Sequence, residues 1–456
     1  MLNETIIAIS TPAGYGGLGT VRLSGSRALG IAKKIFRPRR KKWRELEPLT
    51  LVLGEVFDGT KNGSIDEAYL AYFPPPRSYT GEEVVEITCH GSPIVLEEAV
   101  SLGTRAGARL AHAGEFTLRA YINGRLDLIQ AQAVSDLITA TSLAQAKISL
   151  GQIRGGLSRH VGAMRSQLVE LMSLVESGIE FPDDGLGISP EKTKASLEAV
   201  LRTANKLVAS YQAGRAMTHG LELAIVGRAN VGKSTLFNAL LDQERAIVSP
   251  YPGTTRDYLR ERIKIKDSLF HLIDMAGLED SPDPVEKEGV KRGGEMASQA
   301  DGILLVLDAS KRERPADLKL INIFLHKRTI LLFNKADLPQ KINRPKCLAL
   351  NPKSRWLEVS ALTGRNLEAL QKLIYEEFAP KAAEQEEVLL HLRQKMMFEK
   401  IGSCLQKALN LLQNGYSDEV WAEEMRRILP IIGELTGEIR VDEVLDTIFS
   451  RFCVGK

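Results

Sequence analysis

The sequence has few cysteines, and none of them are paired by spacing. Its 456 residues include four cysteines, at Cys89, Cys347, Cys404 and Cys453, with no C-x-x-C arrangement. This pattern indicates neither a disulfide framework nor a zinc site, and it favours a reducing, cytosolic setting. Long hydrophobic runs are also missing: no stretch reaches roughly 18 apolar residues, and the first residues lack a basic segment followed by an apolar core. We therefore expect a cytoplasmic protein that is neither secreted nor inserted in a membrane.

A strong charge of either sign is absent as well. The formal net charge is +3 and the isoelectric point is about 8.5, which permits a nucleic-acid partner without demanding one. The basic run at residues 37–42 lacks interleaved aromatic residues. We interpret it as a solvated loop, with an RNA contact as the alternative.

Hydrophobic periodicity divides the chain into four segments. Residues 1–118 mix short β-type runs with two helical stretches, which predicts an α+β domain. Residues 119–215 and 380–456 carry apolar residues at helical spacing, and residues 216–379 alternate strand and helix signals as a doubly wound sheet does. The simplest architecture is an α/β domain inserted into a helical domain, although separate helical domains are an alternative.

Individual elements are predicted within these segments. In residues 1–118 we expect strands at Thr5–Ile9, Gly19–Leu23, Leu49–Phe57, Ile65–Phe73 and Val84–Cys89, and helices at Ser26–Phe36 and Pro93–Gly103. In residues 216–379 we expect a hairpin of Tyr258–Ile265 with Phe270–Ile273 and later strands at Ile303–Leu307, Ile330–Phe333 and Trp356–Val359. A helix that starts at Pro190 should end near Tyr211, with residues 213–215 as a linker.

A glycine-rich loop stands between the apolar run 223–226 and a helical stretch. Residues 227–235 read GRANVGKST, which fits the pattern G-x-x-x-x-G-K-[ST]. In such a loop the backbone N–H groups surround phosphate oxygens, Lys233 reaches the outer phosphates, and Ser234 can bind Mg²⁺. An ordinary glycine-rich turn is disfavoured by the strand before it and the helix after it. The predicted nucleotide-binding residues here are Asn230, Val231, Gly232, Lys233, Ser234 and Thr235.

Further motifs in the correct order indicate a guanine nucleotide. Residues 274–277 read DMAG, so that Asp274 can hold Mg²⁺ through water and the Gly277 amide can sense the γ-phosphate. Residues 334–337 read NKAD, and the Asp337 carboxylate can accept two hydrogen bonds that guanine donates and adenine does not. The GTTRD segment at 253–257 supplies a threonine for Mg²⁺, and the SAL segment at 360–362 lies where a loop would close over the base. We predict GTP contacts from Ser249, Thr254, Thr255, Asp274, Gly277, Asn334, Lys335, Asp337, Ser360 and Ala361, and a Ras-like P-loop GTPase rather than an ATPase or kinase.

The catalytic position differs from that of Ras-like enzymes, which place a glutamine directly after the DxxG glycine to orient the attacking water. Here that residue is Leu278, which cannot orient water. Glu286 follows an Asp/Pro-rich segment and is the candidate to act in its place, together with Lys233; the alternative is that Glu286 only begins a helix. No arginine finger is evident, so a cation beside the phosphates is a natural substitute, and Asn230 carries a suitable oxygen.

Motifs outside the GTPase segment extend over almost the whole chain. They include TPAG at 11–14, VRLSG at 21–25, SYTGEEVVE at 78–86, GEFT at 114–117, NGRLD at 123–127 and CVGK at 453–456. With these motifs the chain resembles the MnmE (TrmE) family of tRNA-modification GTPases. The resemblance implies a homodimer formed through the N-terminal domains, and GTPase domains that meet when GTP and K⁺ bind, which activates hydrolysis. It implies Mg²⁺ at Ser234 and Thr255, with Asp274 acting through water, and K⁺ at Asn230, Ser249, Tyr251 and Thr254.

The resemblance also implies the substrate and a second cofactor. Together with a flavin-containing partner, in a heterotetramer, such proteins add an aminomethyl or carboxymethylaminomethyl group to carbon 5 of the tRNA wobble uridine. A 5-formyltetrahydrofolate is implied at Arg22, Glu86, Arg125 and Lys456, with Cys453 near the one-carbon chemistry. A carboxylate suits the amide edge of a pterin and basic groups suit the folate carboxylates, although each of these residues could instead be an ordinary surface charge.

A second class of function remains open from the sequence. A ribosome-assembly GTPase, acting as a nucleotide-dependent RNA-binding switch, would use the same nucleotide motifs. Such a protein should carry an RNA-binding module, for example a KH domain with its G-x-x-G loop, and no such pattern follows residue 380.

Overall fold

The computed structural model describes residues 4–39, 43, 46–60, 63–180, 190–245, 260–266, 268–275, 299–379, 391–439, 442–450 and 452–456. Contacts divide the chain into two units. The first comprises Met1–Thr139, Ser149–Asn205 and Met396–Lys456, and the second comprises Ala140–Ile148 and Lys206–Lys395. The second unit is therefore inserted in the sequence of the first.

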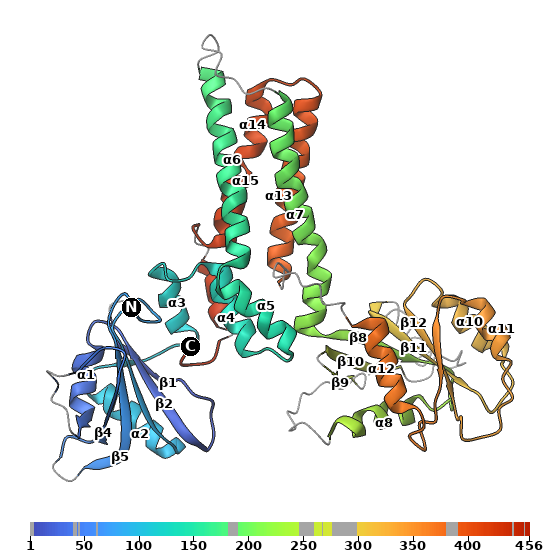
Figure 1. Cartoon of the computed structure of the whole chain (residues 1–456), viewed down its shortest axis with the longest axis horizontal. Helices are drawn as coiled ribbons and strands as arrows, with labels where there is room; N and C mark the ends of the chain where they lie inside the picture. The colour runs from blue at the N-terminus through green and yellow to red at the C-terminus, as the bar shows by residue number, and fades with distance from the viewer. Residues whose placement is uncertain are drawn as a thin grey trace, which may run out of the picture. The chain divides into compact units, whose positions relative to one another are not determined.

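A seven-stranded sheet forms the N-terminal part of the first unit (Figure 1), with the order β3-β4-β5-β6-β2-β1-β7. Neighbouring strands are antiparallel except for the parallel pair β1 and β7. Helices α1 (Ala28–Ile35) and α2 (Pro93–Arg105) cover one face, because their buried residues share one core with the inward residues of the sheet. The strands are β1 (Ile6–Ile9), β2 (Gly16–Ser24), β3 (Phe36–Pro38), β4 (Leu51–Phe57), β5 (Ser64–Phe73), β6 (Val84–Gly91) and β7 (Arg109–Leu110).

The two shortest strands were not predicted from the sequence. Helix α1 ends at Ile35, and Phe36 pairs with Val56 in the sheet instead of continuing the helix. The basic run begins in β3, where Arg37 lies opposite Glu55 and forms an ion pair of 3.2 Å. The interpretation of this run as a loop is therefore wrong at its start, because the pairing of Arg37 with the cross-strand Glu55 stabilises it as strand. Residues 40–42 lie outside the described part of the chain.

The rest of the first unit, where the structure describes it, is mainly helical. Helix α6 (Gly156–Glu180) packs against α14 (Asp418–Arg426) and α15 (Ile428–Thr436). The remaining helices of the first unit are α3 (Glu115–Ile122), α4 (Leu128–Ile138) and α16 (Asp442–Phe449). Helices α5 (Leu143–Ile153), α7 (Pro190–His219) and α13 (Leu392–Gln413) cross the boundary between the units in sequence.

The segment expected to link two domains is helical. Residues 213–215 lie inside α7, which continues to His219. Alanine and arginine are good helix formers, and a single glycine costs only about 1 kcal/mol in a helix, so this short segment does not interrupt α7. The predicted linker is therefore wrong.

A six-stranded sheet forms the core of the second unit, with the order β13-β12-β11-β8-β10-β9. All pairs are parallel except β9 with β10, which form the predicted hairpin. Helices α8 (Lys233–Arg245) and α12 (Leu367–Phe378) pack on one face, and α10 (Pro315–Ile323) and α11 (Arg344–Leu350) pack on the other. The predicted doubly wound domain is thus confirmed. Its strands are β8 (Leu221–Val226), β9 (Arg260–Ile265), β10 (Ser268–Asp274), β11 (Gly302–Asp308), β12 (Thr329–Asn334) and β13 (Arg355–Glu358).

Within the described ranges, no helix is both long enough and apolar enough to cross a bilayer.

Candidate functional site

The glycine-rich loop connects β8 to α8 at the carboxyl edge of the second sheet. Because β8, β10, β11 and β12 are mutually parallel, the residues that follow each of them gather at this edge. The loop passes close to its neighbours: a Cβ at Gly227 would lie 2.5 Å from the Val306 carbonyl oxygen, and one at Gly232 would lie 2.3 Å from Nδ2 of Asn334. Gly232 also has a φ of +98°, so both positions require glycine.

The phosphate end of this site holds three of the predicted groups together. Nζ of Lys233 donates to the Arg228 carbonyl oxygen at 2.9 Å, and Oγ of Ser234 donates to Oδ2 of Asp274 at 2.8 Å. Asp274 is buried, and its Oδ1 has no hydrogen-bond partner among the described residues. An unsatisfied carboxylate oxygen beside a hydroxyl fits the oxygen ligands that Mg²⁺ prefers. Thr235, the next residue, is exposed.

The base end is assembled from the loops after β12 and β13. Asn334 is buried and bridges two loops: its Nδ2 donates to the Val231 carbonyl oxygen at 2.8 Å and its Oδ1 accepts from the Ala361 N–H at 3.0 Å. Ser360 Oγ donates to Oδ1 of Asp337 at 2.5 Å, while the Asp337 side chain stays exposed for a ligand. The structure therefore places the predicted base-reading residues in one cluster with the phosphate loop.

Two acidic residues at this edge were missed by the sequence reasoning. Asp308 ends β11 and accepts from Nζ of Lys335 at 2.7 Å, and that same Nζ donates to the Asn230 carbonyl oxygen at 2.8 Å. Burial alone would raise the pKa of Asp308, but hydrogen bonds from Lys335 and Ser310 outweigh it and leave the pKa lowered. Asp308 stands at the end of an apolar run in the sequence, and this position could have identified it as a candidate site residue.

The second missed acid is Asp317 in α10. Its Oδ1 lies 2.8 Å from Nε of Arg228, and both side chains are nearly buried, with 11% of the Arg228 side chain and 7% of the Asp317 side chain exposed. This ion pair ties the phosphate loop to the start of α10. No pattern in the sequence indicated the pair, because its members lie 89 positions apart.

Several predicted residues lie outside the described part of the chain. They are the potassium and magnesium candidates Ser249, Tyr251, Thr254 and Thr255, the γ-phosphate sensor Gly277 and the catalytic candidate Glu286.

A separate cluster lies on the sheet of the first unit. Arg22 in β2 is directly opposite Glu86 in β6, and both Nε and Nη2 of Arg22 lie 2.8 Å from Oε1 of Glu86. The Arg22 guanidinium carbon is 5.7 Å from the ring centroids of both Tyr79 and Phe116. Oε2 of Glu86 has no hydrogen-bond partner within the described ranges. This second carboxylate oxygen fits the amide edge of a pterin.

The last residues of the chain dock beside this pair. Val454 forms a β-bridge with Ala113, and the Gly455 carbonyl oxygen accepts from Nη1 of Arg22 at 3.3 Å. Burial, followed by repulsion from Arg22, lowers the pKa of Lys456, and Glu86 opposes this shift only in part. Lys456 directly follows Gly455, so the tail brings it to the same cluster.

Two other predicted residues stand at the margin of this cluster. Cys453 is exposed. Arg125 is exposed and lies beside Gly81, whose added Cβ would be 3.3 Å from Cγ of Arg125. Among the described residues Arg125 has no hydrogen bond or ion pair with Arg22, Glu86 or Lys456.

Comparison with known proteins covers both units. A family profile described as "GTP-binding protein TrmE N-terminus" matches residues 5–125, and one described as "MnmE helical domain" matches residues 128–453. Proteins named tRNA modification GTPase MnmE match this chain over its full length and over their own full length. The identity is 39% for the protein from Syntrophus aciditrophicus and 38% for those from Aquifex aeolicus and Geobacter sulfurreducens. These matches confirm the resemblance seen in the sequence motifs. The chain belongs to the MnmE (TrmE) family of tRNA-modification GTPases.

Proposed function

We propose that this chain hydrolyses GTP as one component of an enzyme that modifies carbon 5 of the tRNA wobble uridine. Its GTPase domain is assigned to residues 216–379. The observation that supports the proposal best is the cluster at the carboxyl edge of the second sheet, where Lys233, Asp274 and Asn334 are brought together from three elements. Its family relatives carry the name of tRNA modification GTPases.

The phosphate end binds and orients the triphosphate. Lys233 exchanges its bond to the Arg228 carbonyl oxygen for contacts to the outer phosphates, which neutralises charge that develops during phosphoryl transfer. Ser234 and Thr255 are assigned as direct ligands of Mg²⁺, and Asp274 as a ligand through water. Bound Mg²⁺ supplies further neutralisation of the phosphate oxygens.

The base end selects guanine. The exposed Asp337 carboxylate accepts from N1 and N2 of the base, while Asn334 and Lys335 hold the loop against the phosphate loop. A base that cannot donate to Asp337 leaves a carboxylate without its partners, which penalises ATP. Ala361 and Ser360 close the site beside the base.

Hydrolysis is assigned to Glu286 with a monovalent cation. Leu278 cannot orient water, so Glu286 takes that role, indirectly, when two GTPase domains meet. K⁺ supplies positive charge where other GTPases use an arginine finger. Asn230 and Thr254 provide side-chain oxygens for it, and Ser249 and Tyr251 provide backbone carbonyls.

The cluster on the first sheet is assigned to 5-formyltetrahydrofolate. Glu86 pairs with the pterin amide edge, and the positive charges of Arg22, Arg125 and Lys456 suit the folate carboxylates and carbonyls. Cys453 stands near the site of one-carbon chemistry. The working assembly is a homodimer joined through N-terminal domains, in a heterotetramer with a flavin-containing partner that acts on tRNA.

The test compares GTP hydrolysis in KCl and NaCl at matched ionic strength, for the wild-type chain, Glu286→Ala and the neighbouring control Glu288→Ala. We expect strong stimulation by K⁺, and loss of hydrolysis without loss of GTP binding only in Glu286→Ala. Equal rates in the two salts would overturn the assignment of the cation. A Glu286→Ala variant as active as wild type would overturn the catalytic assignment.

The tRNA part of the proposal has its own test. Cells that express only Glu286→Ala should lose the carbon-5 modification of the wobble uridine, measured by mass spectrometry of digested tRNA. Intact modification in those cells would separate GTP hydrolysis from tRNA chemistry.

A further inference from the structure

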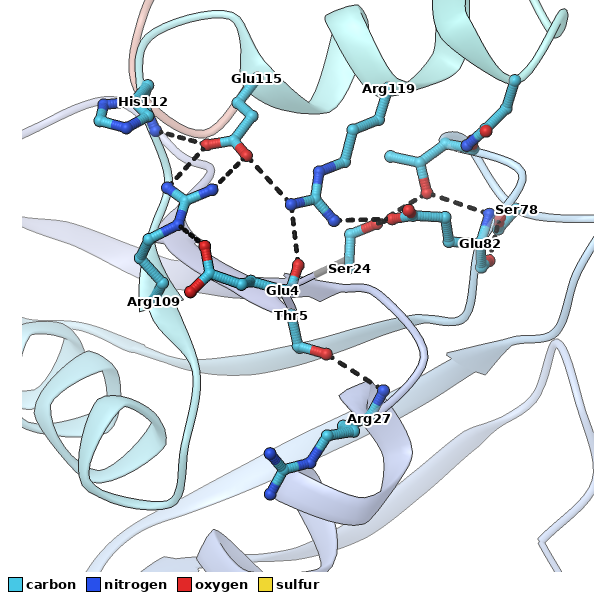
Figure 2. Close-up of polar contacts among 12 residues, drawn as sticks. Glu4, Thr5, Ser24, Arg27, Ser78, Glu82, Arg109, His112, Glu115 and Arg119 are labelled. Atoms are coloured by element: carbon cyan, nitrogen blue, oxygen red, sulfur yellow. Dashed lines mark hydrogen bonds and ion pairs between the residues drawn. The ribbon is translucent and has the colours of Figure 1, made fainter. Parts of the chain in front are cut away.

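Arg119 in α3 is a buried cation that joins three segments of the first unit. It is 1% exposed. Its Nη1 donates to Oε2 of Glu82 at 3.0 Å, and its Nη2 donates to Oε1 of Glu115 at 3.0 Å and to the Glu4 carbonyl oxygen at 2.8 Å (Figure 2). A buried charge that lost these acceptors would be left without compensation, so the position of Arg119 is tightly determined.

Glu115, one of the two acids paired with Arg119, is itself held by an ion pair with Arg109. Glu115 accepts from Arg109 through both oxygens, at 2.6 and 3.1 Å, and its Oε2 also accepts from the His112 N–H at 2.9 Å (Figure 2). Burial alone would raise the pKa of Glu115, but these donors and Arg119 outweigh burial and leave the pKa lowered. Glu115 therefore stays ionised and fixes one end of the Arg119 guanidinium.

The other end of the guanidinium holds the loop formed by residues 78–82. Oε2 of Glu82 accepts from Arg119 and also from Oγ of Ser24 at 2.7 Å (Figure 2). Ser24 Oγ lies 2.7 Å from Oγ1 of Thr80, and the Thr80 carbonyl oxygen accepts from Nδ2 of Asn123 at 2.8 Å. The loop is thus fastened to β2 and to the end of α3 by side chains.

This loop touches both arginines that are assigned to folate. Tyr79 lies against the Arg22 guanidinium, with 5.7 Å to the ring centroid, and its hydroxyl is 2.9 Å from Oγ1 of Thr117. Gly81, with a φ of +80°, lies against the side chain of Arg125. A shift of the loop would therefore move Arg22 and Arg125 together.

We propose that Arg119 is a positioning residue for the folate pocket, acting through Glu82 and the loop of residues 78–82. The proposal rests on the folate assignment made above. Arginine suits this place because its planar fork reaches Glu82, Glu115 and the Glu4 carbonyl at once, and the single ammonium of lysine cannot reproduce that geometry.

The experiment measures 5-formyltetrahydrofolate binding to the full-length chain by isothermal titration calorimetry. The variants are Arg119→Lys, Glu82→Gln and the control Arg105→Lys, which alters an exposed arginine paired with Glu98 in α2. We expect Arg119→Lys and Glu82→Gln to bind folate at least about tenfold more weakly, equivalent to about 1.4 kcal/mol. Arg105→Lys should bind like wild type, and GTP hydrolysis without folate should be unchanged in all three.

A double-variant cycle separates positioning from simple destabilisation. If Glu82 acts through the loop, the effects of Glu82→Gln and Tyr79→Phe on folate affinity will not add, whereas independent effects will. Wild-type affinity in folded Glu82→Gln would overturn the proposal even if Arg119→Lys fails to fold, as would strict additivity in the cycle. No folate binding by the wild-type chain would instead remove the folate assignment itself, and this inference with it.

Discussion

Ser234 and Asp274 hydrogen-bond to each other at the mouth of the phosphate loop, with 2.8 Å between Oγ and Oδ2. Ser234 lies in the first turn of α8 and Asp274 ends β10, so two elements contribute one group each. Both groups are assigned to Mg²⁺, and the second carboxylate oxygen of Asp274 is buried without a partner among the described residues. Ser234 can bind Mg²⁺ through a lone pair of its hydroxyl oxygen while still donating to Asp274, and the orphaned oxygen can accept a hydrogen bond from a water on the metal.

Asp274→Asn should weaken the binding of Mg²⁺ at the GTP site without unfolding the domain. The amide keeps an acceptor for Ser234 but loses the negative charge, so we expect GTP hydrolysis to fall by more than about tenfold, or about 1.4 kcal/mol. The Mg²⁺ concentration for half-maximal activity should rise. Asp242→Asn, an exposed change in α8, is the control, and identical Mg²⁺ titrations for the two variants would refute the assignment.

Asp337→Asn should change the preferred base. The amide can accept from N1 of xanthine and donate to its oxygen at carbon 2, whereas guanine presents an amino group there. Two charge-assisted hydrogen bonds at about 1.5–3 kcal/mol each are altered, so GTP affinity should drop at least about 100-fold while xanthosine triphosphate binds better. Fluorescence titration with both nucleotides measures this, and an unchanged preference for GTP would count against base reading by Asp337.

Arg228→Met should destabilise the second unit. Removing one partner leaves Asp317 charged and buried, which costs about 3–5 kcal/mol. Asp317 also accepts from the Arg314 N–H, so Asp317→Asn is the better second change because its amide oxygen keeps that bond. Calorimetry should show a lower unfolding temperature for Arg228→Met and partial recovery in the double variant. Failure to recover would show that Arg228 acts beyond the pair.

Three of the four cysteines, Cys89, Cys347 and Cys453, should react with iodoacetamide in a fixed order. Burial raises the pKa of Cys89 to about 12 and that of Cys347 to about 11, from an ordinary 9.0, whereas Cys453 is exposed. Because the thiolate is the reactive form, Cys453 should be alkylated first at pH 8, and Cys89 and Cys347 only after unfolding. Peptide mass spectrometry measures the order, and early labelling of Cys89 would contradict its burial.

The same shifts predict a loss of stability at alkaline pH. The folded chain holds these two thiol protons more tightly than the unfolded chain, so the stabilisation is complete below about pH 9 and declines as pH rises toward about 12. Thermal unfolding of Cys347→Ala should show a weaker decline over that range than wild type.

Gly455→Ala should displace the C-terminal tail from the first sheet. Gly455 has a φ of +99°, and an added Cβ would lie 2.2 Å from the Ile9 carbonyl oxygen, which is backbone and cannot move aside easily. Folate affinity should therefore fall while GTP hydrolysis remains. Val454→Ala, at a side chain that is 58% exposed, is the control, and equal folate affinity in both would show that the tail is dispensable.

The second unit was the easier one to predict from the sequence. Its central strands are buried on both faces, so β11 and β12 appear as continuous apolar runs, and the chemistry-bearing residues follow those runs directly. Strands β3 and β7 have three and two residues, which is too short for any period to show. Their existence depends on the neighbouring strands.

The cluster assigned to folate, on the sheet of the first unit, was predictable only in part. Sequence motifs indicated Arg22 and Glu86 but not their direct pairing, and nothing local shows that Arg119 is buried, since arginines in helices usually face solvent. Its distant partners are Glu4, just before β1, and Glu82 in the loop of residues 78–82, and only the assembled fold brings them to Arg119.

The contact of Arg22 with Gly455 joins positions 433 residues apart. Closing so long a loop is entropically affordable, because each doubling of its length costs only about 0.6 kcal/mol, but such contacts form slowly compared with local hairpins and helices. We therefore expect the tail to dock after both sheets have folded. In a refolding experiment, recovery of folate binding should lag behind recovery of nucleotide binding. Folate binding would then report that the whole chain has folded.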